Sequence, residues 1–269
     1  MLKTLLLLSF TLCVSATFLS GATTRPNIVL IVADDMRADA IHALGNDAVQ
    51  TPNIDLLVKR GASFFQVYNM GSTVPGVGAS SRAMLLSGRS LFRFSGDLTD
   101  SKDDMPLLPE ILRNAGYATF ATGKWQNGHR WFERSFSHGD EIIFGTGENE
   151  GELEVFDFDE TGAYAETAGH RPVGNLNENF AEATATFLRD RPRGKPFFAY
   201  VSFSAPTVPQ DVPQGYRSLY AAKQPQAPAN YLREQPIDID GKNPRPPMGP
   251  CQKPRPGLRF ANSSPITTE

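Results

Sequence analysis

Two neighbouring carboxylates, Asp34 and Asp35, are the first side chains in this sequence whose types and spacing suggest chemistry. They come directly after an apolar, β-branched run at residues 28–33, so we expect them at the carboxyl end of a buried strand. Ligands of open α/β sheets gather beyond that end of the strands. Adjacent carboxylates repel each other unless a cation or hydrogen-bond donors offset their charge, and carboxylate oxygens suit a hard ion such as calcium. A helix N-cap pair is an equally good interpretation of the spacing alone.

Residues 77–89 read Val-Gly-Ala-Ser-Ser-Arg-Ala-Met-Leu-Leu-Ser-Gly-Arg. This stretch resembles the signature of the sulfatase family, Cys/Ser-x-Pro-Ser-Arg followed a few residues later by Thr-Gly-Arg. In the arylsulfatase-like, formylglycine-dependent members of the alkaline phosphatase superfamily, the first residue is oxidised to an aldehyde whose hydrate attacks the sulfur of a sulfate ester. Gly78 stands at that position, and Ser80 replaces the proline. Glycine has no Cβ to oxidise, so formylglycine is not possible at Gly78.

Two further segments resemble sulfatase motifs but lack the histidine of each. Gly-Lys-Trp-Gln at 123–126 is similar to Gly-Lys-Trp-His, and Ala-Pro-Thr-Val-Pro at 205–209 is similar to Ala-Pro-His-Asp-Pro. The resemblance implies that Lys124 contacts the sulfate, and that Gln126 and Thr207 stand where two sulfate-binding histidines would be. Glutamine can donate a hydrogen bond but cannot deliver a proton at neutral pH. His129, three residues after Gln126, is the histidine that would have to compensate.

The same resemblance gives roles to Arg82 and to the acidic pair. Arg82 matches the arginine that supports the formylglycine, and together with Lys124 it would bind the substrate. Asp34 and Asp35 match an Asp-Asp pair that ligates calcium in sulfatases. The later segment that completes this calcium site in the family, Asp followed by Asn or His and then Gly, does not occur, so we expect only half of a calcium site.

The elements that position these residues alternate between strands and helices. Apolar runs predict strands at 28–33, 62–67, 117–122 and 196–203, whereas helical spacing of apolar residues predicts helices at 52–60, 107–115 and 180–188. This order indicates an α/β fold with a mostly parallel central sheet flanked by helices. The resemblance covers the N-terminal part of the sulfatase fold, so we expect the sheet to be incomplete at the C-terminus.

Composition divides the chain into three parts. Residues 1–22 combine an early lysine, an apolar run and small residues, which predicts a secretory signal peptide and a secreted or periplasmic protein. An uncleaved membrane anchor is the alternative, although the run is short for a span of about 20 residues. Residues 26–240 form the sulfatase-like domain, in which the acidic, Gly-rich stretch 148–177 is predicted to be a surface excursion. Residues 241–269 are Pro-rich and predicted to be disordered.

Charge and cysteine content limit the function further. A net charge of -3 over 269 residues argues against nucleic acid or a membrane surface as partner. Cleavage of the signal would leave Cys251 as the only cysteine, which excludes a disulfide framework. No segment after the signal could cross a membrane. The resemblance implies a sulfated small molecule or polysaccharide as partner, and the oligomeric state cannot be read from the sequence.

Together these features predict a secreted member of the sulfatase family whose ancestral reaction is sulfate-ester hydrolysis. Loss of the nucleophile at Gly78 and of the histidines at Gln126 and Thr207 predicts that the chain is inactive or severely impaired. One alternative is a non-catalytic protein that binds calcium and a sulfated glycan through its remaining charged residues. A second alternative is a truncated record of an active sulfatase, with a frame shift or early stop near residue 240. A third is residual hydrolysis in which Ser80 or Ser81 is the nucleophile.

Overall fold

A computed structural model describes residues 25–37, 39–72, 77–95, 98, 105–145, 153–207 and 212–220. The predicted signal peptide and the predicted tail lie outside the described residues. The four described strands are β1 (Ile28–Asp34), β2 (Ala118–Lys124), β3 (His138–Ile143) and β4 (Phe197–Pro206). The α-helices are α2 (Pro52–Arg60), α3 (Gly78–Ser87), α4 (Leu108–Asn114), α5 (His129–Ser135), α6 (Leu176–Asp190) and α7 (Gln214–Tyr220). Short 3₁₀ helices η2, η3 and η6 cover His42–Leu44, Leu91–Arg93 and Glu166–Ala168.

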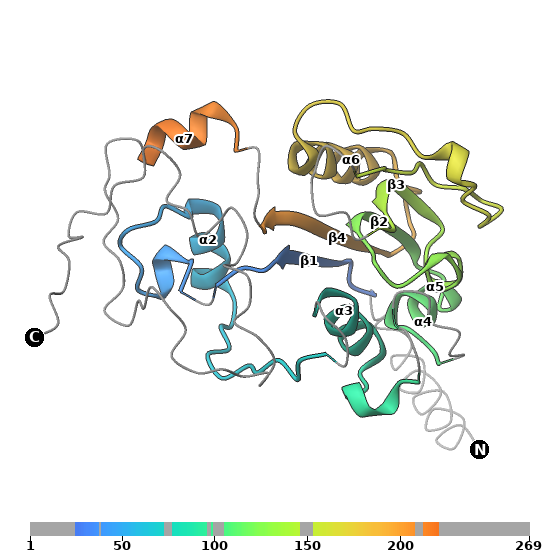
Figure 1. The fold of residues 1–269 in the computed structure, drawn as a ribbon. Helices are drawn as coiled ribbons and strands as arrows, with labels where there is room; N and C mark the ends of the chain where they lie inside the picture. Colours follow the sequence, from blue (N-terminus) through green and yellow to red (C-terminus); the bar gives the residue numbers. More distant parts are fainter. Residues whose placement is uncertain are drawn as a thin grey trace, which may run out of the picture.

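The strands form one parallel sheet in the order β1-β4-β2-β3. Helix α6 packs on one face of this sheet, and α3, α4 and α5 lie on the other face (Figure 1). The predicted α/β fold with a mostly parallel sheet is therefore confirmed. Because all four strands run in the same direction, their carboxyl ends meet at one edge of the sheet.

The two central strands, β2 and β4, are buried along most of their length, as their apolar sequences predict. The prediction that β1 is buried on both faces is wrong for the described part of the chain. Its residues alternate in exposure, and the side chains of Val29 and Ile31 are 47% and 57% exposed. The reason is position: β1 is an edge strand that pairs with β4 alone among the described residues, and no described element covers its outer face.

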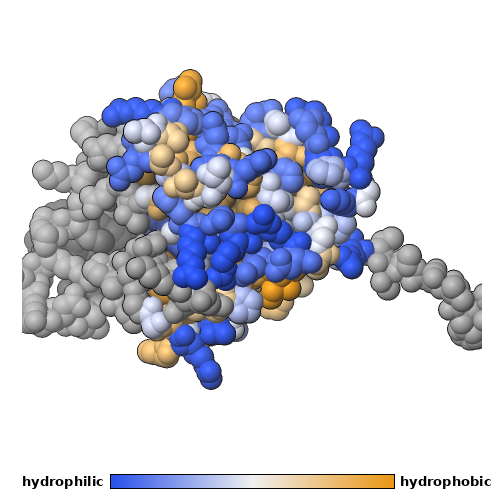
Figure 2. Space-filling model, turned by 90° about the vertical axis from the view of Figure 1, so that its right-hand side faces the viewer, coloured by the Kyte–Doolittle hydropathy of each residue, from blue (hydrophilic) through white to orange (hydrophobic). Residues whose placement is uncertain are grey.

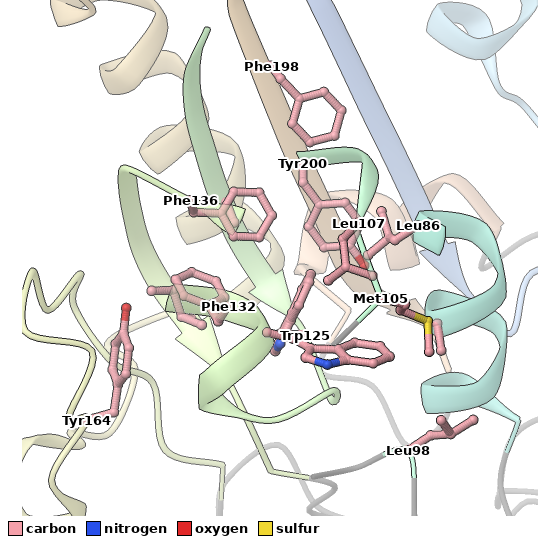
Figure 3. Packing of buried hydrophobic residues seen from close by; sticks show 14 of the residues in the cluster. Leu86, Leu98, Met105, Leu107, Trp125, Phe132, Phe136, Tyr164, Phe198 and Tyr200 are labelled. Carbon is pink, nitrogen blue, oxygen red and sulfur yellow. The ribbon is translucent and has the colours of Figure 1, made fainter. Parts of the chain in front are cut away.

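An aromatic core lies between the sheet and helices α3 to α5 and supports the turn that follows β2. The ring of Trp125 meets Phe132, Phe136 and Tyr200 edge-on, with centroids 5.6, 5.4 and 5.9 Å apart (Figure 3). Each such pair adds about 0.5–1.5 kcal/mol beyond the buried area. Trp125 is thereby fixed next to Lys124 on one side and Gln126 on the other, which gives both residues a rigid base.

The structure corrects one further expectation and refines another. No strand forms at 62–67, where the chain is irregular and Phe64 is 83% exposed. The described part of the predicted excursion, 153–177, is largely exposed, as expected, but a few of its apolar residues are packed. Val155 and Phe156 are buried there, and Phe156 forms an antiparallel bridge with Ile142.

The surface on the side of β3 and α5 is mostly hydrophilic, with small hydrophobic patches (Figure 2). Within the described ranges, the helices are all too short or too polar to cross a membrane.

Candidate functional site

Residues from four separate segments meet at the carboxyl ends of the strands. Asp34 ends β1, Lys124 ends β2, Thr207 directly follows β4, and Arg82 reaches the same place from helix α3. We call these four residues, with Gly78 and Gln126, the charged cluster. The parallel sheet explains the convergence of three of them, because its strands end side by side.

Asp34 is the shared acceptor of the charged cluster. Lys124 Nζ donates to its Oδ2 at 2.5 Å, Arg82 Nη2 to its Oδ1 at 3.2 Å, and the Thr207 hydroxyl to its Oδ2 at 2.9 Å. Burial raises the pKa of Asp34, but the hydrogen bond from Lys124 and the positive charges of Arg82 and Lys124 outweigh it, so the pKa lies below its ordinary value. The carboxylate is therefore ionised and already paired at neutral pH.

The guanidinium of Arg82 is 3% exposed and holds three segments together. Its Nε donates to the carbonyl of Lys124 at 3.2 Å, and its Nη1 donates to Oε1 of Gln126 at 3.0 Å. Its Nη2 also donates to the hydroxyl of Ser202 at 3.1 Å. A buried arginine with partners around its whole fork is fixed in place, because each donor would be costly to leave unpaired.

Gly78 is the first residue of helix α3 and faces the charged cluster. A Cβ built on Gly78 would lie 2.5 Å from Gln126 Oε1 and 3.0 Å from Arg82 Nη1. The position that the resemblance assigns to the nucleophile is thus within the cluster, and it carries no nucleophilic atom. Helix α3 ends at Ser87, where Gly88 adopts the left-handed conformation with a φ of 67°.

Two buried polar residues at the site were missed from the sequence. Ser202 lies in β4, and its polarity inside an otherwise apolar strand is the signal that could have identified it. Asn127 donates through Nδ2 to the carbonyls of Ala79 and Leu98, at 2.9 and 2.8 Å, and ties the turn after β2 to the start of helix α3. Nothing in the local sequence distinguishes Asn127 from an ordinary turn residue.

Asp35 does not join the charged cluster. Its backbone has a φ of 62°, and its side chain is exposed. Calcium takes six to eight oxygen ligands, whereas both oxygens of Asp34 accept hydrogen bonds from cationic side chains. The described ranges contain no group of three or more His, Cys, Asp or Glu residues placed to hold a metal ion. These residues alone do not fit calcium, and the half-site stays a prediction that needs ligands from outside them.

The alternative nucleophiles and the alternative proton donor each have a partner outside the charged cluster. Ser80 Oγ is 2.9 Å from Ser72 Oγ, and Ser81 Oγ accepts from Asn69 Nδ2 at 3.4 Å. The ring of His129 packs against Phe144, with centroids 4.2 Å apart, in the aromatic core.

Comparison with known proteins identifies the family. The family model for sulfatases matches residues 26–251. The chain is 29% identical over 221 residues to human N-acetylgalactosamine-6-sulfatase and 30% identical over 189 residues to N-acetylglucosamine-6-O-sulfatase of Bacteroides thetaiotaomicron. It is 29% identical over 242 residues to an arylsulfatase of Clostridium perfringens. These matches cover 71%, 68% and 73% of this chain, but only 41%, 31% and 46% of the relatives.

Solved structures agree on the fold. A protein solved in complex with its substrate D-glucosamine-2-N,6-O-disulfate matches with a TM-score of 0.64 at 23% identity, over 77% of this chain and 40% of that one. The crystal structure of Ps i-CgsB with k-i-k-neocarrahexaose matches with a TM-score of 0.55 at 25% identity, over 69% of this chain and 46% of the other. The chain spans less than half the length of each of the relatives and solved proteins named above. On its sequence and its α/β sheet, this chain belongs to the sulfatase family.

Proposed function

We propose that this sulfatase-family chain is catalytically inactive or severely impaired in sulfate-ester hydrolysis. The observation that carries the proposal is the environment of Gly78. At the nucleophile's position there is no side chain, and the nearest groups are the amide oxygen of Gln126 and the guanidinium of Arg82. An amide oxygen is a poor nucleophile, and the guanidinium has no lone pair to offer.

Neither residue that stands at a histidine position supports proton transfer. Hydrolysis requires a donor for the leaving group, and such donors contribute about 10²–10⁴-fold to the rate. Gln126 cannot titrate near neutral pH, and its Oε1 accepts from Arg82. The Thr207 hydroxyl donates to Asp34, and threonine is not an acid at neutral pH. The residues at the positions of the nucleophile and of both histidines therefore cannot attack the ester or protonate its leaving group.

Turnover of an aryl sulfate by the purified full chain tests this proposal. The arylsulfatase of Clostridium perfringens serves as positive control, and an Arg82→Ala variant of this chain sets the background. We expect the wild type and Arg82→Ala to be indistinguishable. Turnover by the wild type that is lost in Arg82→Ala and in Lys124→Ala would show that this site hydrolyses sulfate esters after all.

Anion binding without hydrolysis is the second candidate function. Two cationic side chains, Arg82 and Lys124, surround one carboxylate, so these three residues carry a net positive charge. The names of two relatives specify 6-sulfated amino sugars, which makes a sulfated saccharide the ligand to test. Cations fixed in a partly desolvated site hold an oxyanion more strongly than surface cations do.

Calorimetry with N-acetylglucosamine 6-sulfate, with and without calcium, measures this candidate function. Binding by the wild type should be lost in Lys124→Ala and retained in Lys59→Ala, which removes an exposed lysine at the end of helix α2. Calcium uptake that depends on Asp34 and Asp35 would support the predicted half-site. If the wild type binds neither the sulfated sugar nor calcium, the proposed binding function is refuted.

Secretion or periplasmic export is proposed from the N-terminal sequence. Cleavage near Ala16 or Ala22 would remove the apolar run before the sulfatase-like domain begins. N-terminal sequencing of the protein recovered outside the cytoplasm should give a start at one of these sites. Recovery of an intact Met1 in the membrane fraction would favour the uncleaved anchor.

A further inference from the structure

The amide of Gln126 lies where a side chain at position 78 would have to lie. The 2.5 Å between Gln126 Oε1 and a Cβ built on Gly78 is well below the roughly 3.5–4.0 Å of a favourable non-bonded contact. Gln126 Cδ would be 3.5 Å from the same Cβ, so the amide lies alongside the first residue of the helix. Alanine, serine, threonine and cysteine all share this Cβ, and the overlap applies to each of them.

Gln126 is held in this place from three directions. Its Oε1 accepts from Arg82 Nη1 at 3.0 Å, so withdrawal of the amide would leave a donor of the buried guanidinium unpaired. Its backbone has a φ of 62°, which an L-residue adopts only when the surroundings impose it. Those surroundings are Trp125, packed in the aromatic core, and Asn127, bonded to the carbonyls of Ala79 and Leu98.

We propose that Gly78 and Gln126 are a matched pair, in which the amide of Gln126 makes any side chain at position 78 destabilising. Gln126 is in this sense a positioning residue: its amide fills the space beside Gly78 and orients the guanidinium of Arg82. A side chain enters at position 78 only when the side chain at 126 is shortened or turned away. Restoring a side chain at position 78 alone therefore costs stability.

A double-mutant cycle between the two positions tests the pair, with thermal unfolding of the full chain as the measurement. Gly78→Ala alone should lower the unfolding midpoint by several degrees, although alanine normally favours a helix over glycine. Gln126→Ala removes the overlapping amide and keeps the Cβ, so the backbone strain at 126 is unchanged. In that background Gly78→Ala should leave the midpoint unchanged or raise it.

Helix α7 supplies a matched control. Gly215 also lies in the first turn of a helix, and a Cβ built on it meets no heavy atom within 4 Å. Gly215→Ala should be neutral or stabilising in both backgrounds. Gln126→Asn, whose amide is one methylene shorter, should rescue Gly78→Ala in part, and this graded rescue would not arise if Gly78→Ala simply damaged helix α3. Should Gly78→Ala fail to fold alone, recovery of folded protein in the double variant is the supporting result.

An equal effect of Gly78→Ala in all three backgrounds, or failure of every Gly78→Ala variant to fold, would overturn the matched pair. This outcome is independent of the proposed lack of activity. Aryl sulfate turnover by the wild type would refute the lack of activity and leave the coupling intact, whereas additive unfolding midpoints would refute the coupling alone.

Discussion

At the scale of single residues, Asp34 is the acceptor that joins three side chains of the charged cluster. Its two oxygens accept from Lys124, Arg82 and Thr207, which come from the ends of β2 and β4 and from helix α3. One carboxylate thereby offsets two positive charges that would otherwise repel each other in a partly buried place. Asp34 is thus a structural counter-ion as well as the residue that the family resemblance assigns to calcium.

This pairing predicts how stability depends on pH. The pKa of Asp34 is lowered in the folded protein, so its stabilising contribution is complete above its unfolded pKa of about 3.9 and is lost as the pH falls through the folded pKa. Asp34→Asn should cost about 2–3 kcal/mol at pH 7, because two cations lose their ionic partner. The difference from wild type should narrow below about pH 4.

Urea unfolding of wild type and Asp34→Asn between pH 7 and pH 3 measures this effect. Asp47→Asn, at an exposed position, is the control and should follow the wild type throughout. A stability difference between wild type and Asp34→Asn that is the same at pH 7 and pH 3 would mean that the ion pairs contribute little.

At the scale of elements, the first turn of helix α6 fixes the end of β4. Asn177 Oδ1 accepts from the backbone amides of Ser204 and Ala205, both at 3.1 Å. These two residues lie at the end of β4, just before Thr207. Asn177→Ala leaves both partly buried amides without this acceptor and should cost about 1–3 kcal/mol. Thr207 should then lose its fixed position beside Asp34.

The free energy of unfolding in urea tests this role, with Glu182→Ala on the same helix as control. Glu182 is exposed and pairs with Arg189 at 3.8 Å, a contact worth less than about 1 kcal/mol. Similar losses for the two variants would contradict a specific role of Asn177 at the strand end.

The strands β2 and β4 and helix α6 were predictable from their strong apolar patterns. Elements that form only because a neighbouring element pairs with them were not predictable from the sequence. The runs at β2 and β4 and the spacing in α6 reflect burial that these segments impose themselves. Strand β3 reads His-Gly-Asp-Glu-Ile-Ile and forms because β2 offers it an edge. Likewise the convergence of Asp34, Arg82 and Lys124 follows from the parallel sheet, whereas the overlap between Gly78 and Gln126 depends on a backbone φ that no sequence pattern reveals.

At the scale of the whole molecule, most of the large apolar side chains that are exposed in the described residues belong to three segments. These segments are β1, α2 and residues 64–92, whereas the side of β3 and α5 is mostly hydrophilic (Figure 2). The exposed members of this set are Val29, Ile31, Ile54, Leu56, Leu57, Phe64, Phe65, Val67, Tyr68, Met70, Val77, Leu85 and Phe92. Edge strands with exposed apolar residues pair readily with other chains.

We therefore predict that the chain, taken alone, self-associates through β1 as its concentration rises. A lysine on an edge strand opposes such pairing, and Ile31 is exposed enough for Ile31→Lys to change stability by less than about 1 kcal/mol. Sedimentation of the wild type should shift to larger species over a concentration series, and Ile31→Lys should suppress the shift. Val173→Lys, at an 86% exposed position before helix α6, adds the same charge away from the edge. Equal suppression by both variants would assign the effect to net charge, and association would then not depend on the edge of the sheet.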